Sequence, residues 1–178
     1  MLPIPPVTTK RIFLLLLLSS FLLHACRNMK NPKSENQTNQ IKGPVSVADL
    51  EDTLKFPWLL LAPGDYTPDP QTLAALQARD LSSLHLVIFA GDWCSDTHYL
   101  LPRFIQLFSM LGQPPVIESV YMLDRSKSSG TGIEKQYAVE YIPVFVFMKD
   151  GKELFRITET TEKSPEQDLL GLLQKAGY

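Results

Sequence analysis

Residues 84–111 constrain the fold of this chain more than any other part of its sequence. They begin with a short apolar, β-branched run at residues 84–90, which is typical of a strand buried on both faces of a sheet. After a loop at residues 91–97, an amphipathic helix is predicted at residues 97–111, because apolar residues recur there at helical spacing. The loop between a strand and the following helix is where α/β proteins usually place their chemistry.

Further elements alternate along the rest of the chain. The other predicted helices are residues 47–56, 71–81 and 133–139, and a last helix capped by Ser164 with Pro165 in its first turn. The other predicted strands are residues 116–123, 144–148 and 153–157, the last two joined by the hairpin turn Asp150-Gly151. The sequence therefore predicts an α/β fold, a three-layer α/β/α sandwich around a central mixed sheet.

The first 25 residues have the features of an export signal. Lys10 and Arg11 precede an uncharged apolar run at residues 12–23, which is short of the about 20 residues that span a bilayer. Residues 23–26, Leu-His-Ala-Cys, resemble the lipobox of bacterial lipoproteins, which implies cleavage before Cys26 and lipidation of its thiol. The alternative is an ordinary signal peptide, or a buried apolar helix, with Cys26 incidental.

Residues 26–44 are polar and almost free of large apolar side chains, so they cannot bury a core and are expected to form a flexible tether. The folded domain then covers residues 45–178. Removal of residues 1–25 takes away two basic residues and no acid, so the formal net charge falls from -2 to -4. We therefore expect a lipid-anchored domain in a bacterial cell envelope, facing the periplasm or the exterior, with no nucleic-acid partner.

The chain has two cysteines, Cys26 and Cys94. Two cysteines exclude a disulfide-dense scaffold and a four-cysteine zinc site. A metal site made of Cys94, Asp96 and His98 would place its ligands on one helical turn, which cannot surround a metal unaided. We expect neither a metal nor a cofactor, and the function depends on what Cys94 does.

The loop that contains Cys94 resembles the active site of the thioredoxin superfamily, and the resemblance extends from Trp58 to the C-terminus. Trp93-Cys94 stands where that family has its active-site Trp-Cys, and Pro102 matches the proline of its active-site helix. Ile142-Pro143 precedes the hairpin as the family's cis-proline loop does. The resemblance implies a thioredoxin-like bacterial lipoprotein that docks peptides or partner proteins near Trp93, Ile142 and Pro143.

Two positions depart from the family pattern. The motif is Cys-x-x-Thr, with Thr97 in place of the second cysteine, and Ile88 stands where the family has a buried carboxylate. If Cys26 carries a lipid, Cys94 is the single thiol of the mature chain. An intramolecular disulfide cycle is then excluded.

A single thiol can still exchange disulfides with other molecules. The N-terminus of the predicted helix favours the thiolate of Cys94, whereas Asp96 opposes it. Thr97 is expected to donate a hydrogen bond to the sulfur, and His98, if protonated, would also favour the thiolate. The leading prediction is a monothiol thiol–disulfide oxidoreductase in which Cys94 attacks disulfides of exported proteins or small thiols. An external thiol then acts as the reductant.

Two other readings of Cys94 stay open. In the first, the domain is a redox-inactive binding module that docks peptides or partner proteins near Trp93 and Pro143, with Asp96 and Ile142 at the same surface. In the second, Cys94 is a thiol that reacts with peroxide. Replacing Cys94 by Ser separates exchange from binding, because binding alone would survive the change.

Overall fold

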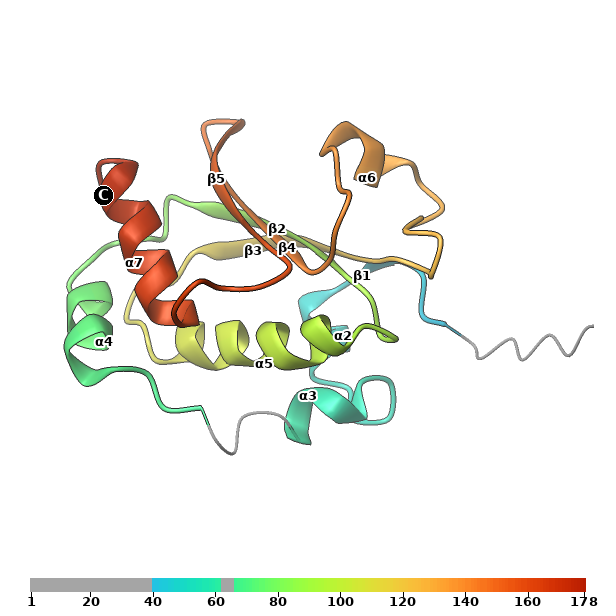
Figure 1. Ribbon diagram of the computed structural model, residues 1–178, viewed down its shortest axis with the longest axis horizontal. Coiled ribbons are helices and arrows are strands. Elements are labelled where there is room, and N and C mark those ends of the chain that lie inside the picture. The colour runs from blue at the N-terminus through green and yellow to red at the C-terminus, as the bar shows by residue number, and fades with distance from the viewer. Residues whose placement is uncertain (1–39, 62–65) are drawn as a thin grey trace, which may run out of the picture. The chain divides into compact units, whose positions relative to one another are not determined.

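A mixed five-stranded sheet lies at the centre of the computed structural model, which describes residues 40–61 and 66–178 (Figure 1). The strands are β1 (Gly43–Val45), β2 (His85–Ala90), β3 (Val116–Met122), β4 (Val144–Lys149) and β5 (Lys152–Thr158). Their order in the sheet is β1-β3-β2-β4-β5. β2 and β3 are parallel, and the other neighbouring pairs are antiparallel. The predicted α/β fold with a mixed sheet is therefore confirmed.

The central strand β2 is buried on both faces. Leu86, Ile88 and Ala90 belong to the larger core cluster, whereas Val87 and Phe89 belong to a smaller cluster on the opposite face. Side chains alternate between the two faces along a strand. An uninterrupted apolar run is therefore what a central position requires, and this is why its sequence pattern predicted the strand within one residue.

Helices cover the face of the sheet that carries Ile88. They are α5 (Ser95–Ser109) and α7 (Pro165–Lys175), with α4 (Pro70–Gln77) packed on α7 and α3 (Pro57–Leu61) packed on α5 (Figure 1). The buried stripe of α5 includes Leu100, Leu101, Phe104 and Phe108, as its apolar spacing predicted. On the opposite face, α6 (Ile133–Gln136) and neighbouring loop residues cover the smaller cluster (Figure 1).

The N-terminal part of the described chain differs from the prediction. The helix expected at residues 47–56 is only α2 (Val47–Leu50), because the Asp52 carboxylate accepts hydrogen bonds from the Leu54 and Lys55 amides and forms a turn instead. Gly43 and Pro44, assigned to the tether from the sequence, pair with β3 as part of β1. A strand of three residues is too short to show a periodic pattern.

The structure contains the predicted hairpin turn at Asp150-Gly151 but not the predicted capping hydrogen bond of Ser164. Asp150 and Gly151 both adopt positive φ, 52° and 73°, as a tight two-residue hairpin turn requires. Ser164 does precede α7, but its side chain makes no capping hydrogen bond. The carboxylate of Asp168 instead accepts hydrogen bonds from backbone amides just before the helix, those of Glu162 and Lys163.

The predicted signal peptide, the lipidation site Cys26 and most of the predicted tether lie outside the described residues. Among the helices of residues 40–61 and 66–178, none has the length and apolar character needed to cross a membrane.

Candidate functional site

Cys94 lies at the junction between the end of β2 and the start of α5. It occupies the N-cap position of the helix in an extended backbone conformation, with φ -98° and ψ 121°, and its side chain makes no capping hydrogen bond. Its carbonyl accepts the His98 amide at 3.1 Å, which begins the helix. The residue is 8% exposed and belongs to the smaller core cluster. Cys94 thus stands at the N-terminus of α5, where the first amides of a helix have no partner within the helix.

The loop before β4 brings a backbone carbonyl to the sulfur of Cys94. The peptide bond between Ile142 and Pro143 is cis, and the Cys94 Sγ lies 3.6 Å from the Ile142 carbonyl oxygen, to which the thiol donates. The structure therefore brings together three of the residues that the sequence predicted for the site, Cys94, Ile142 and Pro143, although Cys94 and Ile142 lie 48 residues apart in the sequence.

Thr97 is completely buried, and its hydroxyl has a partner other than the one expected. The Gly91 amide donates a hydrogen bond to Thr97 Oγ1 at 3.2 Å, and the structure contains no hydrogen bond between Thr97 and the sulfur of Cys94. The expectation that Thr97 acts directly on the thiolate is thus not what the geometry shows. The side chain instead closes the turn from strand to helix.

Trp93 packs beside Cys94 and is fixed by a hydrogen bond. Its indole Nε1 donates to the Leu123 carbonyl at 2.8 Å, just after β3. Gly91 lies close to the same ring, because a Cβ atom at Gly91 would be 3.0 Å from the indole nitrogen and 2.8 Å from Ile142 Cδ1. This corner of the site therefore has no room for a side chain at position 91.

Asp92 and His98, two polar residues near Cys94 in the sequence, have partners other than its sulfur. Asp96 lies in the first turn of α5. Asp92 Oδ2 accepts the Ile41 amide at 3.4 Å, and its backbone carbonyl is 2.6 Å from His98 Nε2. The ring of His98 stacks on Trp58, with centroids 4.2 Å apart and planes 21° apart. His98 is thus held by Asp92 and Trp58, and its imidazole is not bonded to the sulfur.

No acid replaces the missing family carboxylate at β2. Ile88 is fully buried in the larger core cluster. Among the described residues, Cys94 is a free cysteine and no group of three potential metal-ligating side chains is present. The groups that the described residues bring together at the site are the Cys94 thiol, the Ile142 carbonyl and the N-terminus of α5.

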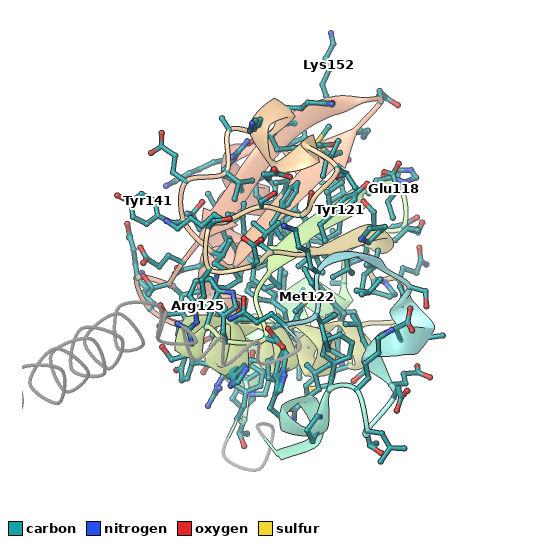
Figure 2. All side chains as sticks on the ribbon, turned by 90° about the vertical axis from the view of Figure 1, so that its right-hand side faces the viewer. Glu118, Tyr121, Met122, Arg125, Tyr141 and Lys152 are labelled. Carbon is teal, nitrogen blue, oxygen red and sulfur yellow. The ribbon has the colours of Figure 1, made fainter. Side chains whose placement is uncertain are left out.

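Sequence reasoning missed the contacts made by the loop after β3. The guanidinium of Arg125 lies over the Trp93 ring, and the ammonium of Lys127 lies over the Tyr141 ring. Figure 2 views the molecule from this end and labels Arg125 and Tyr141. The sequence marked residues 124–131 only as a Ser- and Gly-rich loop, and no local spacing signals a contact between a loop and a distant ring.

Known proteins that are similar to this chain include thioredoxins. The thioredoxin family model matches residues 74–175. The chain is 26% identical to thioredoxin H-type 1 of Nicotiana tabacum over 51% of its length and 68% of that protein. It is 28% identical to thioredoxin H1 of Arabidopsis thaliana, over 46% of the chain and 66% of the relative. The crystal structure of Fasciola hepatica thioredoxin aligns with a TM-score of 0.35 at 23% identity, covering 58% of this chain and 90% of that one.

Proposed function

This chain belongs to the thioredoxin family, and on that premise we propose that it performs thiol–disulfide exchange with Cys94 as its only reacting thiol. The observation that carries the proposal is the position of Cys94, at the N-terminus of α5 with its sulfur 3.6 Å from the Ile142 carbonyl. Backbone amides at a helix N-terminus stabilise a thiolate. The backbone beside Ile142 offers polar groups to an extended partner chain.

The reaction needs two exchanges. In the first, the Cys94 thiolate attacks one sulfur of an external disulfide, a new bond joins Cys94 to that sulfur, and the other sulfur leaves as a thiolate. In the second, an external thiolate attacks the mixed disulfide and releases the Cys94 thiolate. The external thiol leaves in a new disulfide with the sulfur that Cys94 had carried. One external thiol is thus oxidised, one sulfur of the original disulfide is reduced, and Cys94 itself is unchanged after a complete cycle.

Thr97 gives this reaction a distinctive property. A neighbouring second thiol would release a trapped partner rapidly, whereas a threonine hydroxyl cannot. Mixed disulfides on Cys94 are therefore expected to persist until an external thiol arrives. The proposed substrates are exported proteins with disulfides or thiols, and small thiols.

The test is to treat the full-length chain with a protein disulfide and to identify adducts by mass spectrometry. Wild type should form a mixed disulfide on Cys94, and Cys94→Ser in a Cys26→Ser background should form none. Cys26→Ser is the matched control, and it should retain the adduct on Cys94. Failure of wild type to form any adduct, or equal capture of partners by Cys94→Ser, would contradict exchange.

A second candidate function is a redox-inactive binding module that docks peptides or partner proteins. The observation that favours it is the low exposure of Cys94, 8%, together with a thiol that already donates to a carbonyl. In that case partner capture would persist unchanged in Cys94→Ser. The same experiment therefore decides between the two functions.

We also propose that the chain is held in a bacterial cell envelope by a lipid on Cys26. The support is the sequence alone: a basic stretch, a short apolar run and a lipobox-like end before Cys26. The folded domain would then meet partners on the periplasmic or exterior side of a membrane.

A further inference from the structure

Two cationic side chains lie against aromatic rings next to the reacting sulfur. The guanidinium carbon of Arg125 is 5.1 Å from the centre of the Trp93 ring, and Lys127 Nζ is 4.8 Å from the centre of the Tyr141 ring. Trp93 directly precedes Cys94, and Tyr141 directly precedes the carbonyl that accepts from the Cys94 sulfur. Each of the two segments that form the site, residues 93–94 and 141–142, therefore has a cation against the aromatic ring that precedes its Cys94 or Ile142 group.

The loop after β3 holds both cations in place. The carboxylate of Asp124 accepts hydrogen bonds from the backbone amides of Ser126 at 2.9 Å and Ser128 at 3.1 Å. It also forms an ion pair with Lys42 at 2.5 Å, and these interactions, that with Lys42 first, hold the pKa of Asp124 well below its usual range. Lys127 Nζ is fixed further by donating to the backbone carbonyl of Glu140. A partner would thus meet preordered cations rather than mobile ones.

Three acids of this region contact other groups. Asp124 faces Lys42, Asp92 faces the Ile41 amide, and Glu134 is buried against the Ser129 hydroxyl. Within residues 40–61 and 66–178, the ion pairs of the structure include neither Arg125 nor Lys127. Among the described acids of this region, those without such a contact are Asp96, in the first turn of α5, and the exposed Glu140. Arg125 and Lys127 therefore lie beside Cys94 with their charges unpaired in the described part of a chain whose formal net charge is -2.

We propose that Arg125 and Lys127 select partners by charge, so that the preferred substrate is an acidic polypeptide segment with carboxylates flanking its reacting cysteine. This inference rests on the proposed exchange function and names the substrate class of the same site. Arg125 is exposed and can present several N–H donors to a carboxylate while the Trp93 ring stays in contact with apolar groups of the partner. Opposite charges also speed encounter between the two molecules.

The test uses three synthetic peptides with one cysteine each, flanked by Glu, Ser or Lys, and joined to 2-thiopyridine as a mixed disulfide. Attack by Cys94 on the peptide sulfur releases 2-thiopyridone, whose absorbance gives the rate constant. The full-length chain carries Cys26→Ser in every variant, so that Cys94 is its single thiol, and it is kept in detergent because of the apolar run at residues 12–23. Wild type should react with the acidic peptide about two- to fivefold faster per cation than with the neutral one, and most slowly with the basic peptide.

Charge variants then show whether these two residues are responsible. Arg125→Gln and Lys127→Gln should each reduce the preference for the acidic peptide, and the double variant should abolish it. Arg125→Lys should retain part of it. Lys152→Gln, at the far hairpin turn labelled in Figure 2, is the matched control and should leave the preference unchanged. Raising the ionic strength from about 0.01 M to about 0.15 M should weaken the preference, because screening shortens the range of the charges.

A binding measurement separates failure of this inference from failure of the exchange function. Cys94→Ser is titrated with peptides of the same three charges in which Ser replaces the cysteine, and tryptophan fluorescence reports binding. Tighter binding of the acidic peptide, lost in the Arg125→Gln/Lys127→Gln background, supports charge selection even if no thiopyridone is released. Equal rates and equal affinities for all three peptides would overturn charge selection while leaving exchange itself intact.

Discussion

Thr97 and Gly91 show how single residues shape the site around Cys94. The second cysteine of the family motif is replaced by a hydroxyl that accepts the Gly91 amide, and both residues are buried. A buried amide without a partner is costly, so this hydrogen bond ties the end of β2 to the first turn of α5. Thr97 is therefore a positioning residue for Cys94.

Thr97→Val tests this role, because it removes the acceptor with little change in shape. The free energy of unfolding should fall by about 1–3 kcal/mol, since the Gly91 amide loses its partner. Urea denaturation measures the change. Thr97→Ser keeps the hydroxyl and should lose less stability than Thr97→Val. Equal stability of Thr97→Val and wild type would contradict the role.

Gly91→Ala tests the close packing beside Trp93. A Cβ atom would lie 2.8 Å from Ile142 Cδ1 and 3.0 Å from the Trp93 indole nitrogen, so the neighbours must move. The expected loss of stability is about 1–3 kcal/mol, and the fluorescence of Trp93 should change. Gly112→Ala, where no atom lies within 4 Å of the added Cβ, should stay within about 0.5 kcal/mol of wild type. If both variants behave alike, the packing argument is wrong.

At the scale of elements, Glu166 joins α7 to the segment that leads into α4. Glu166 is 3% exposed and accepts hydrogen bonds from the Tyr66 hydroxyl at 2.8 Å and the Asp69 amide at 3.1 Å. Burial acts to raise the pKa of Glu166, but the hydrogen bonds it accepts outweigh burial and hold that pKa below its ordinary value. The carboxylate form therefore stabilises the contact between these elements.

Glu166→Gln should make the free energy of unfolding less dependent on pH, because Gln does not ionise. Because the folded-state pKa is lowered, the ionised group stabilises the protein fully above its ordinary pKa of 4.5, and this contribution is lost as pH falls through the folded-state value. The variant should be about 1–3 kcal/mol less stable at pH 7, and the difference should shrink below pH 4.5.

Urea denaturation from pH 7 down to about pH 3 measures this difference in stability above and below the ordinary carboxyl pKa of 4.5. Glu162→Gln, at an exposed position just before α7, is the control and should show no comparable loss at neutral pH. A stability difference for Glu166→Gln that is the same at every pH would contradict the linkage.

For the whole molecule, the sequence predicted what depends on local pattern. The central strand β2, the amphipathic α5, the Asp150-Gly151 turn and the place of Cys94 between strand and helix all follow from period and turn chemistry. Contacts between residues that are far apart in the sequence could not be predicted in this way. The bonds from Trp93 to the Leu123 carbonyl and from Tyr66 to Glu166 join residues 30 and 100 positions apart. No spacing rule connects such residues before the sheet order is known.

The proposed anchor makes a prediction for the whole chain in a bacterial host. Wild type should incorporate a labelled fatty acid and Cys26→Ser should not, because the acceptor thiol is lost. The alkylation rate of Cys94 should be the same in both, since the proposed lipid site is not part of the folded domain. Labelling of Cys26→Ser, or no labelling of wild type, would contradict the anchor.

The chain enters the sheet at the same end as the reacting sulfur. The Ile41 amide donates to Asp92, two residues before Cys94, and β1 follows directly. If the lipid is on Cys26, the 15 residues from there to Ile41 can extend to about 54 Å at most, at roughly 3.3–3.6 Å per residue. The anchor would then limit how far Cys94 can move from the membrane. Disulfides within that depth of the bilayer surface could be reached, and those deeper in the compartment would have to come to the membrane.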